Sequence, residues 1–172
     1  MSLHAESVPT LSRTLENMSK WLDLASKDAE ERGFDVSRLL EARLAPDQFN
    51  LTRNIQSACD TGKFVATRMG GVEAAAHEDG PATVEELQAR ISDVRALLAQ
   101  VSPESFEGNR EETLTLMRGM TMSGQAYLRQ FAMPNFFFHA AMSYAILRHN
   151  GVKLGKRDFL GAIEVTPAPQ KE

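Results

Sequence analysis

The sequence predicts an all-α fold, a four-helix bundle with a short insert between the third and fourth long helices. Two observations lead to this prediction. Four long segments carry apolar residues three and four positions apart, which is the period of an amphipathic helix. Capping residues and glycines mark where these segments begin and end. Four amphipathic helices of this kind are typical of a helical bundle.

The first long helix is expected to follow Ser7 as its N-cap, with Pro9 in its first turn, and to end at Gly33. Its apolar residues alternate at spacings of three and four and form one stripe: Leu11, Leu15, Met18, Leu22, Ala25 and Ala29. A short helical piece over Val36–Leu44 comes next.

The second long helix is predicted over Asp47–Met69, where Gly70 and Gly71 close it. A polar linker over Glu73–Pro81 follows. The third helix begins at the capping-box sequence Thr83–Glu86. This helix has the most regular apolar stripe of the chain, formed by Val84, Leu87, Ile91, Val94, Leu98 and Val101.

The insert before the fourth helix alternates polar and apolar residues over Thr113–Met122, around Arg118 and Gly119. This pattern indicates a small hairpin. A short helix is predicted over Gln125–Met133, and the fourth long helix over Pro134–Asn150.

Composition and charge argue against a nucleic-acid-binding protein and against a membrane protein. The chain of 172 residues has a net charge of −4, which argues against binding to nucleic acid or to an anionic membrane surface. No apolar run is long enough to span a bilayer, and the first residues lack the layout of a signal peptide, so we expect a cytoplasmic protein. We expect one domain over residues 1–161 and a flexible tail over 162–172.

The segment HAAMSYAILRHNGV, His139–Val152, resembles the last helix of the DinB/YfiT-like superfamily of metalloenzymes. In that superfamily a histidine is followed by a helix that ends in a glycine-valine step. With PNFFF before it, GKRDFL after it and ACD in the second helix, the chain more closely resembles an uncharacterised branch of the superfamily, a domain of unknown function. The resemblance covers Val8–Gly161. It implies a DinB-like bundle without an established activity.

The superfamily pattern also implies a metal site. There, three histidines bind a divalent metal, one from the second helix and two from the fourth helix at i and i+4. This chain has His139 at the later fourth-helix position and Asn135 at the earlier one. The second-helix position falls on Gln56 or Cys59, and helical phase favours Cys59 as the inward-pointing residue. A three-histidine site is therefore absent, and zinc or nickel would bind only weakly at His139.

The candidate ligand-binding residues are His139, Asn135, Cys59 and Asp60, and each has a structural alternative. His139 is either a core histidine bonded to a neighbour, which we favour, or a metal ligand or acid–base group. Cys59 is either a soft ligand or a packing residue. Asp60 either supports a site from behind the ligands, lines a dimer interface or, as we favour, belongs to a solvated face that it shares with Arg53, Gln56 and Lys63.

Three consecutive phenylalanines, Phe136–Phe138, point in different directions around the fourth helix. This helix must then be covered on nearly all sides, either by the insert or by a second subunit, so we expect a homodimer.

The leading functional hypothesis is a small-molecule-binding or structural homodimer with a degenerate metal site. The alternative is a metal-dependent transferase or hydrolase that uses His139. Whether the protein is an enzyme is left open by the sequence.

Overall fold

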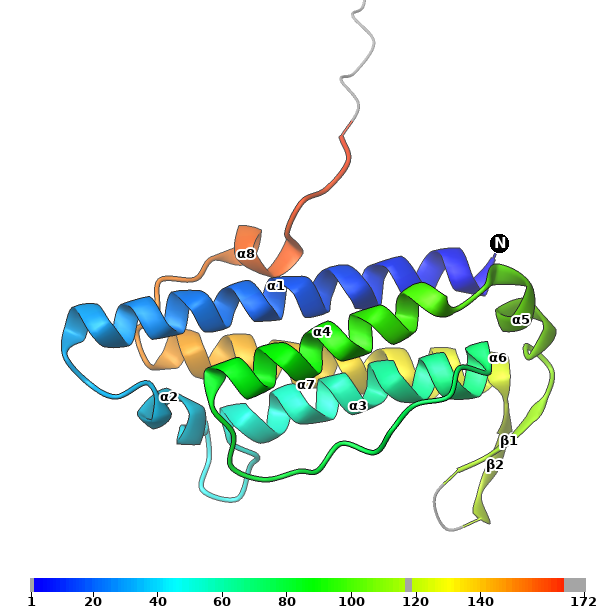
Figure 1. Ribbon diagram of the computed structural model, residues 1–172, viewed down its shortest axis with the longest axis horizontal. Coiled ribbons are helices and arrows are strands. Elements are labelled where there is room, and N and C mark those ends of the chain that lie inside the picture. Colours follow the sequence, from blue (N-terminus) through cyan, green and yellow to red (C-terminus); the bar gives the residue numbers. More distant parts are fainter. Residues whose placement is uncertain (1, 117–118, 166–172) are drawn as a thin grey trace, which may run out of the picture.

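Four long helices dominate the fold: α1 (Leu3–Arg32), α3 (Leu51–Gly70), α4 (Val84–Gln100) and α7 (Met133–His149). They lie side by side along the long axis of the molecule (Figure 1). In this computed structural model, residues 2–116 and 119–165 are described. The helical fold that the sequence predicted is confirmed. Within the described ranges, no helix combines the length and the apolar character that crossing a membrane requires.

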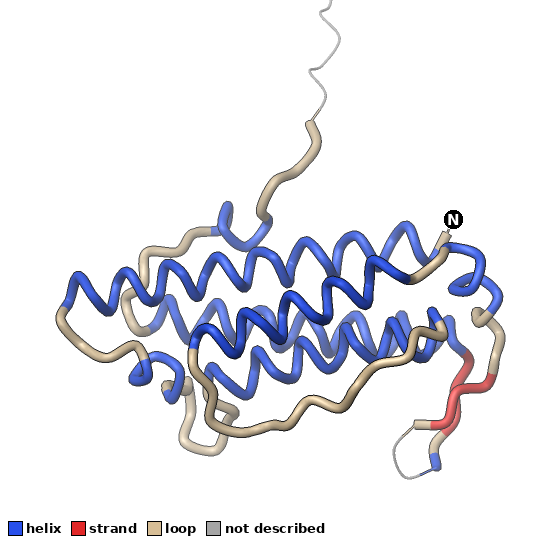
Figure 2. The backbone as a smooth tube through the Cα atoms, in the orientation of Figure 1, coloured by secondary structure: helices blue, strands red, loops and turns tan. Residues whose placement is uncertain are grey.

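Short elements connect these helices, namely α2 (Ser37–Glu41), α5 (Pro103–Gly108), β1 (Thr113–Thr115), β2 (Thr121–Ser123) and α6 (Gly124–Ala126), and α8 (Lys156–Leu160) follows the last of them. The two strands form the predicted hairpin, drawn in red in Figure 2, in which Thr113 pairs with Ser123. Arg118 of the predicted turn lies outside the described residues. So does the part of the predicted tail over 166–172, whereas residues 162–165 are exposed.

Helix α1 begins four residues before the predicted cap. The hydroxyl of Ser2 accepts a hydrogen bond from the backbone N–H of Ala5, which makes Ser2 the N-cap. The prediction that Ser7 is the cap is wrong, because its buried hydroxyl donates to the carbonyl of Leu3 inside the helix. Pro9 consequently lies in the helix interior.

The capping box at the start of α4 is confirmed. The hydroxyl of Thr83 accepts from the N–H of Glu86, and the Glu86 carboxylate accepts from the N–H of Thr83. The linker of residues 71–83 runs back along the helices from the end of α3 to the start of α4 (Figures 1 and 2). As a result, α3 and α4 point in the same direction.

The short helix predicted over Gln125–Met133 runs into α7 without a break. A π-helical turn, η2 (Tyr127–Ala132), joins α6 to α7. Pro134 lies at the start of α7, directly after this turn. A proline lacks a backbone N–H, so one hydrogen bond of this continuous helix is missing at Pro134, and the π-helical turn lies just before that place.

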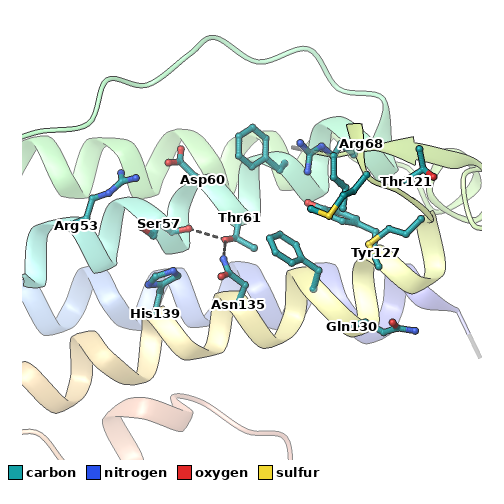
Figure 3. Close-up of a pocket in the computed structure, with 15 residues that line it drawn as sticks. Arg53, Ser57, Asp60, Thr61, Arg68, Thr121, Tyr127, Gln130, Asn135 and His139 are labelled. Carbon is teal, nitrogen blue, oxygen red and sulfur yellow. Dashed lines mark hydrogen bonds between the residues drawn. The ribbon is translucent and has the colours of Figure 1, made fainter. Parts of the chain in front are cut away.

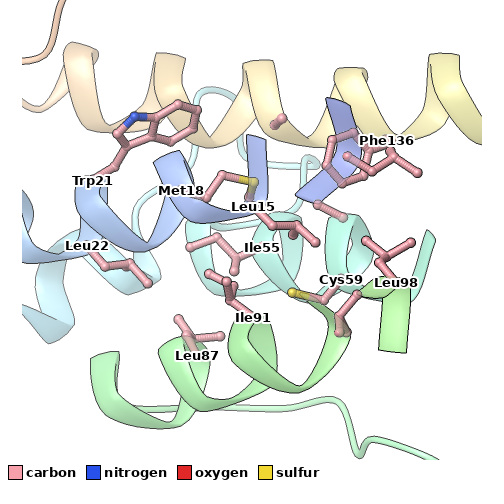
Figure 4. Close-up of a cluster of buried hydrophobic side chains, with 14 of the residues drawn as sticks. Leu15, Met18, Trp21, Leu22, Ile55, Cys59, Leu87, Ile91, Leu98 and Phe136 are labelled. Atoms are coloured by element: carbon pink, nitrogen blue, oxygen red, sulfur yellow. The ribbon is translucent and has the colours of Figure 1, made fainter. Parts of the chain in front are cut away.

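The hydrophobic core lies between the four long helices (Figure 4). Its largest buried side chains include Trp21 of α1, Phe106 of α5, Tyr127 of η2 and Phe136 of α7. Of the predicted phenylalanine triplet, Phe136 is fully buried, Phe137 is half-buried and Phe138 is 56% exposed. The described chain by itself therefore leaves one side of α7 uncovered.

Candidate functional site

A pocket of about 570 Å³ opens between α3 and α7 and reaches the β1–β2 hairpin at one end (Figure 3). Three of the four candidate residues line it, namely Asp60 on α3 and Asn135 and His139 on α7. The fourth, Cys59, does not. The other polar side chains of the wall are Arg53, Ser57, Thr61, Arg68, Thr121, Tyr127 and Gln130.

His139 is held in one tautomer by its neighbour on α3. Its Nδ1 lies 3.0 Å from Oδ1 of Asn54. The amide nitrogen of Asn54 donates to the carbonyls of Phe49 and Asn50, which leaves Oδ1 as an acceptor. Nδ1 of His139 therefore carries the proton. Nε2 has no hydrogen-bond partner among the described residues, so its lone pair is available to a molecule in the pocket.

The surroundings of His139 keep its ring neutral. Burial lowers the pKa of His139, and the nearby Arg53 guanidinium lowers it further. The ring of Phe49 stacks on the imidazole at 6.2 Å, and Phe138 meets it edge-on at 5.2 Å. His139 thus combines the features of a bonded core histidine at Nδ1 with an acceptor at Nε2.

Asn135 connects the two helices that form the pocket. Its amide nitrogen donates to Oγ1 of Thr61 at 2.8 Å, and the Thr61 hydroxyl donates to the carbonyl of Ser57 (Figure 3). This chain of bonds fixes the orientation of the Asn135 amide. Its Oδ1 has no hydrogen-bond partner in the described part of the chain and is a second acceptor in the wall.

Cys59 points inward, as helical phase predicted, but into the hydrophobic core (Figure 4). Its side chain is 0% exposed. Burial raises the pKa of the thiol to about 12, so it is neutral at physiological pH. A protonated thiol buried among apolar side chains is neither a metal ligand nor a nucleophile, and we do not include Cys59 in the candidate site.

The prediction that Asp60 belongs to a solvated face is wrong. The linker between α3 and α4 covers this side of α3, and only 3% of Gln56, 7% of Lys63 and 7% of Arg90 is exposed. Helical phase correctly places Gln56, Asp60 and Lys63 on one side of α3. It cannot show that a loop packs over that side.

Beneath the linker, Asp60 belongs to a network of charges. Its carboxylate lies 2.8 Å from Arg90 and 3.3 Å from Lys63. Arg90 also bonds the carboxylate of Asp79 at 3.0 Å, and Asp79 pairs with Arg53. The network gives Asp60 close cationic partners and connects the linker to α3 and α4.

Aromatic side chains and an arginine form the other end of the pocket. Arg68 lies over the rings of Phe64 and Tyr127, with its guanidinium carbon 4.7 Å and 5.3 Å from their centroids. Phe131 stacks on Tyr127 at 6.0 Å. The remaining apolar wall comes from the hairpin, through Leu116, Met120 and Met122.

The residues present do not fit a three-histidine metal site. Gln56 donates its amide to the carbonyl of Gly80 under the linker and does not line the pocket. Cys59 lies in the core, and Asn135 offers one amide oxygen, a poor ligand for zinc or nickel. Among the described residues, no three His, Cys, Asp or Glu side chains are grouped so that they could hold a metal ion.

Comparison with known proteins agrees with the resemblance in the fourth helix. A family model described as "Domain of unknown function (DUF1993)" matches residues 3–160. The chain belongs to the DUF1993 family. This DUF1993 chain is also similar to a crystal structure described as a DinB family member protein from Shewanella denitrificans. The two share 37% sequence identity over 96% of each chain, with a TM-score of 0.91. No curated protein matches the chain.

Sequence reasoning missed most residues of the DUF1993 pocket, which lie on α3, on the hairpin and on η2. Six residues of α3 line it at helical spacing, and they form a second stripe beside the core stripe: Arg53, Ser57, Asp60, Thr61, Phe64 and Arg68. One signal in the sequence could have indicated this second stripe, namely the aromatic Phe64 among otherwise polar residues. Tyr127 and Phe131 carried no such signal, because their contact with α3 depends on the π-helical turn.

Proposed function

We propose that this DUF1993 protein is a DinB-like four-helix bundle that binds a small organic molecule in the α3–α7 pocket. The observation that carries the proposal is the lining of the pocket, where acceptor atoms of His139 and Asn135 without described partners share the wall with Phe64, Tyr127 and Phe131. A largely apolar wall with a few fixed polar atoms is typical of small-molecule sites, which occupy about 300–1,000 Å³. The pocket volume of about 570 Å³ lies within this range.

Binding of N-phenylnaphthylamine, an uncharged probe that fluoresces in apolar surroundings, tests the proposal. We expect saturable binding, and we expect Phe131→Ser to weaken it about tenfold, because the substitution removes an aromatic wall of the pocket. Leu160→Ser is the control, since its side chain is as exposed as that of Phe131 but lies on α8 and does not line the pocket. No saturable binding, or an equal loss in both variants, would contradict the proposal.

The homodimer and the degenerate metal site are part of the same proposal. The exposed ring of Phe138 on α7 supports a second subunit on that side of the helix. The positions of Gln56, Cys59 and Asn135 support the loss of metal binding, because they leave His139 as the one imidazole of the superfamily site.

Native mass spectrometry tests both statements in one measurement. We expect the mass of a dimer without bound metal, and conversion to monomer in Phe138→Ser. A wild-type monomer would contradict the dimer. Near-stoichiometric zinc or nickel that disappears in His139→Ala would contradict the degenerate site and favour the alternative function.

That alternative, a metal-dependent transferase or hydrolase using His139, is supported by one observation. The Nε2 atom of the neutral His139 ring is an acceptor without a described partner in the wall of the pocket, which is the form that a general base or a metal ligand takes. The side chains around His139 offer no second imidazole, so they support small-molecule binding better than metal-dependent catalysis.

A further inference from the structure

Arg68 differs from the other arginine of the pocket wall in having no acidic partner. Arg53 pairs with Asp79. Within the described ranges, no Asp or Glu carboxylate lies within ion-pair distance of Arg68, which contacts the rings of Phe64 and Tyr127 and bonds the Tyr127 hydroxyl. The two rings position the guanidinium without using up its hydrogen-bond donors on a carboxylate.

Hydrogen-bond acceptors gather at the opposite end of the pocket. The Asp60 carboxylate, Nε2 of His139 and Oδ1 of Asn135 are all hydrogen-bond acceptors. An anionic group there would lie beside three acceptors and would find one remaining donor on these side chains, the second amide hydrogen of Asn135. The charge of Arg53 at this end is offset by the carboxylate of Asp79. The pocket therefore favours an anion at the Arg68 end.

The wall beside Arg68 is apolar. Phe131 and Met122 line it beside Tyr127. Thr61, which bonds Asn135, lies seven residues before Arg68 on α3. At 1.5 Å per residue this corresponds to about 10 Å along the helix axis. The space suits a ring system that reaches from Arg68 toward Asn135.

We propose that the ligand of this pocket is an apolar, ring-containing organic anion. Its acidic group, a carboxylate, sulfonate or phosphate, binds Arg68, and its apolar body packs against Phe131 and Met122. This inference rests on the proposed function and adds the chemical class of the ligand. A guanidinium binds such groups through two parallel hydrogen bonds, an interaction that an ammonium group cannot reproduce.

Two probes that differ by one charged group test the inference. Anilinonaphthalene sulfonate has the ring system of N-phenylnaphthylamine plus a sulfonate. We expect the wild-type protein to bind the sulfonate probe more tightly. Arg68→Gln should weaken binding of the sulfonate probe about tenfold, the effect of losing a hydrogen bond to a charged group. It should change binding of the uncharged probe far less, so the ratio of the two affinities falls, and the remaining saturable binding shows that the variant is folded.

Arg13→Gln is the matched control, because it removes the same charge from an exposed site on α1 outside the pocket. Arg68→Lys should recover only part of the lost affinity. An unchanged ratio of the two affinities in Arg68→Gln, or an equal change in Arg13→Gln, would overturn the inference and leave the proposed function intact. If the wild-type protein did not bind the uncharged probe, or if Phe131→Ser did not weaken that binding, the proposed function itself would be overturned.

Discussion

Replacing Trp21 with alanine is expected to lower the free energy of unfolding by about 3–5 kcal/mol, the cost of emptying a buried aromatic site. Trp21 is 1% exposed, and its indole N–H donates to the carbonyl of Asp158 in α8 at 3.0 Å. Its ring stacks on Phe159 at 5.5 Å and meets Tyr144 of α7 at 5.9 Å. One side chain of α1 therefore attaches both α7 and α8.

Urea denaturation followed by circular dichroism measures this effect, since Trp21 is the one tryptophan of the chain and its fluorescence is lost in the variant. Trp21→Phe keeps a ring against Phe159 and loses the hydrogen bond, so it should cost less than Trp21→Ala. Leu24→Ala, at a 36% exposed site on the same helix, is the control and should cost far less. A loss below about 1 kcal/mol in Trp21→Ala would show that α8 does not pack on α1 in this way.

Arg90→Met is expected to cost about 3 kcal/mol, because it leaves the carboxylates of Asp60 and of the linker residue Asp79 without their shared partner. Arg90 is 7% exposed, and it bonds Asp60, Asp79 and the carbonyl of Glu78. We place the effect at the low end for a buried pair, since Lys63 and Arg53 still reach the two carboxylates.

Arg95→Met is the matched control for this prediction. Arg95 lies on the same helix and pairs with Glu16 at 2.9 Å, but both side chains are about two-fifths exposed. An exposed pair of this kind contributes about 0–1 kcal/mol. Equal losses in Arg90→Met and Arg95→Met would contradict the role that we assign to the network beneath the linker.

The long helices could be predicted because their signals are local. The three-and-four spacing in α4 and the capping box at Thr83 lie within a few residues of each other, and both are confirmed. The hairpin before Gly124 was also predictable from its alternation. The start of α1 was missed because Ser7 and Pro9 imitate a helix start, while the actual cap, Ser2, lies before a segment with few apolar residues.

The covering of α3 could not be predicted, because it depends on pairs that are distant in the sequence. Arg90 meets Asp60 across thirty positions, and neither residue carries a local signal of the other. Without that pairing, a helix face with Asp60 and Lys63 resembles any exposed charged face.

The candidate site was predicted in part. His139 and Asn135 were found through their position in the family pattern, and the pocket contains both. Arg68 was not found, since its importance depends on Tyr127 and on the hairpin, which only the folded chain brings to it. Cys59 points inward as predicted, but its side chain enters the hydrophobic core and not the pocket.

A crystal structure of the protein with bound N-phenylnaphthylamine tests the central claim most directly. We predict density for the naphthyl rings between α3 and α7, against Phe131 and beside Asn135. Density confined to the exposed rings of Phe49 and Phe138, with the α3–α7 pocket closed or filled by protein side chains, would contradict it.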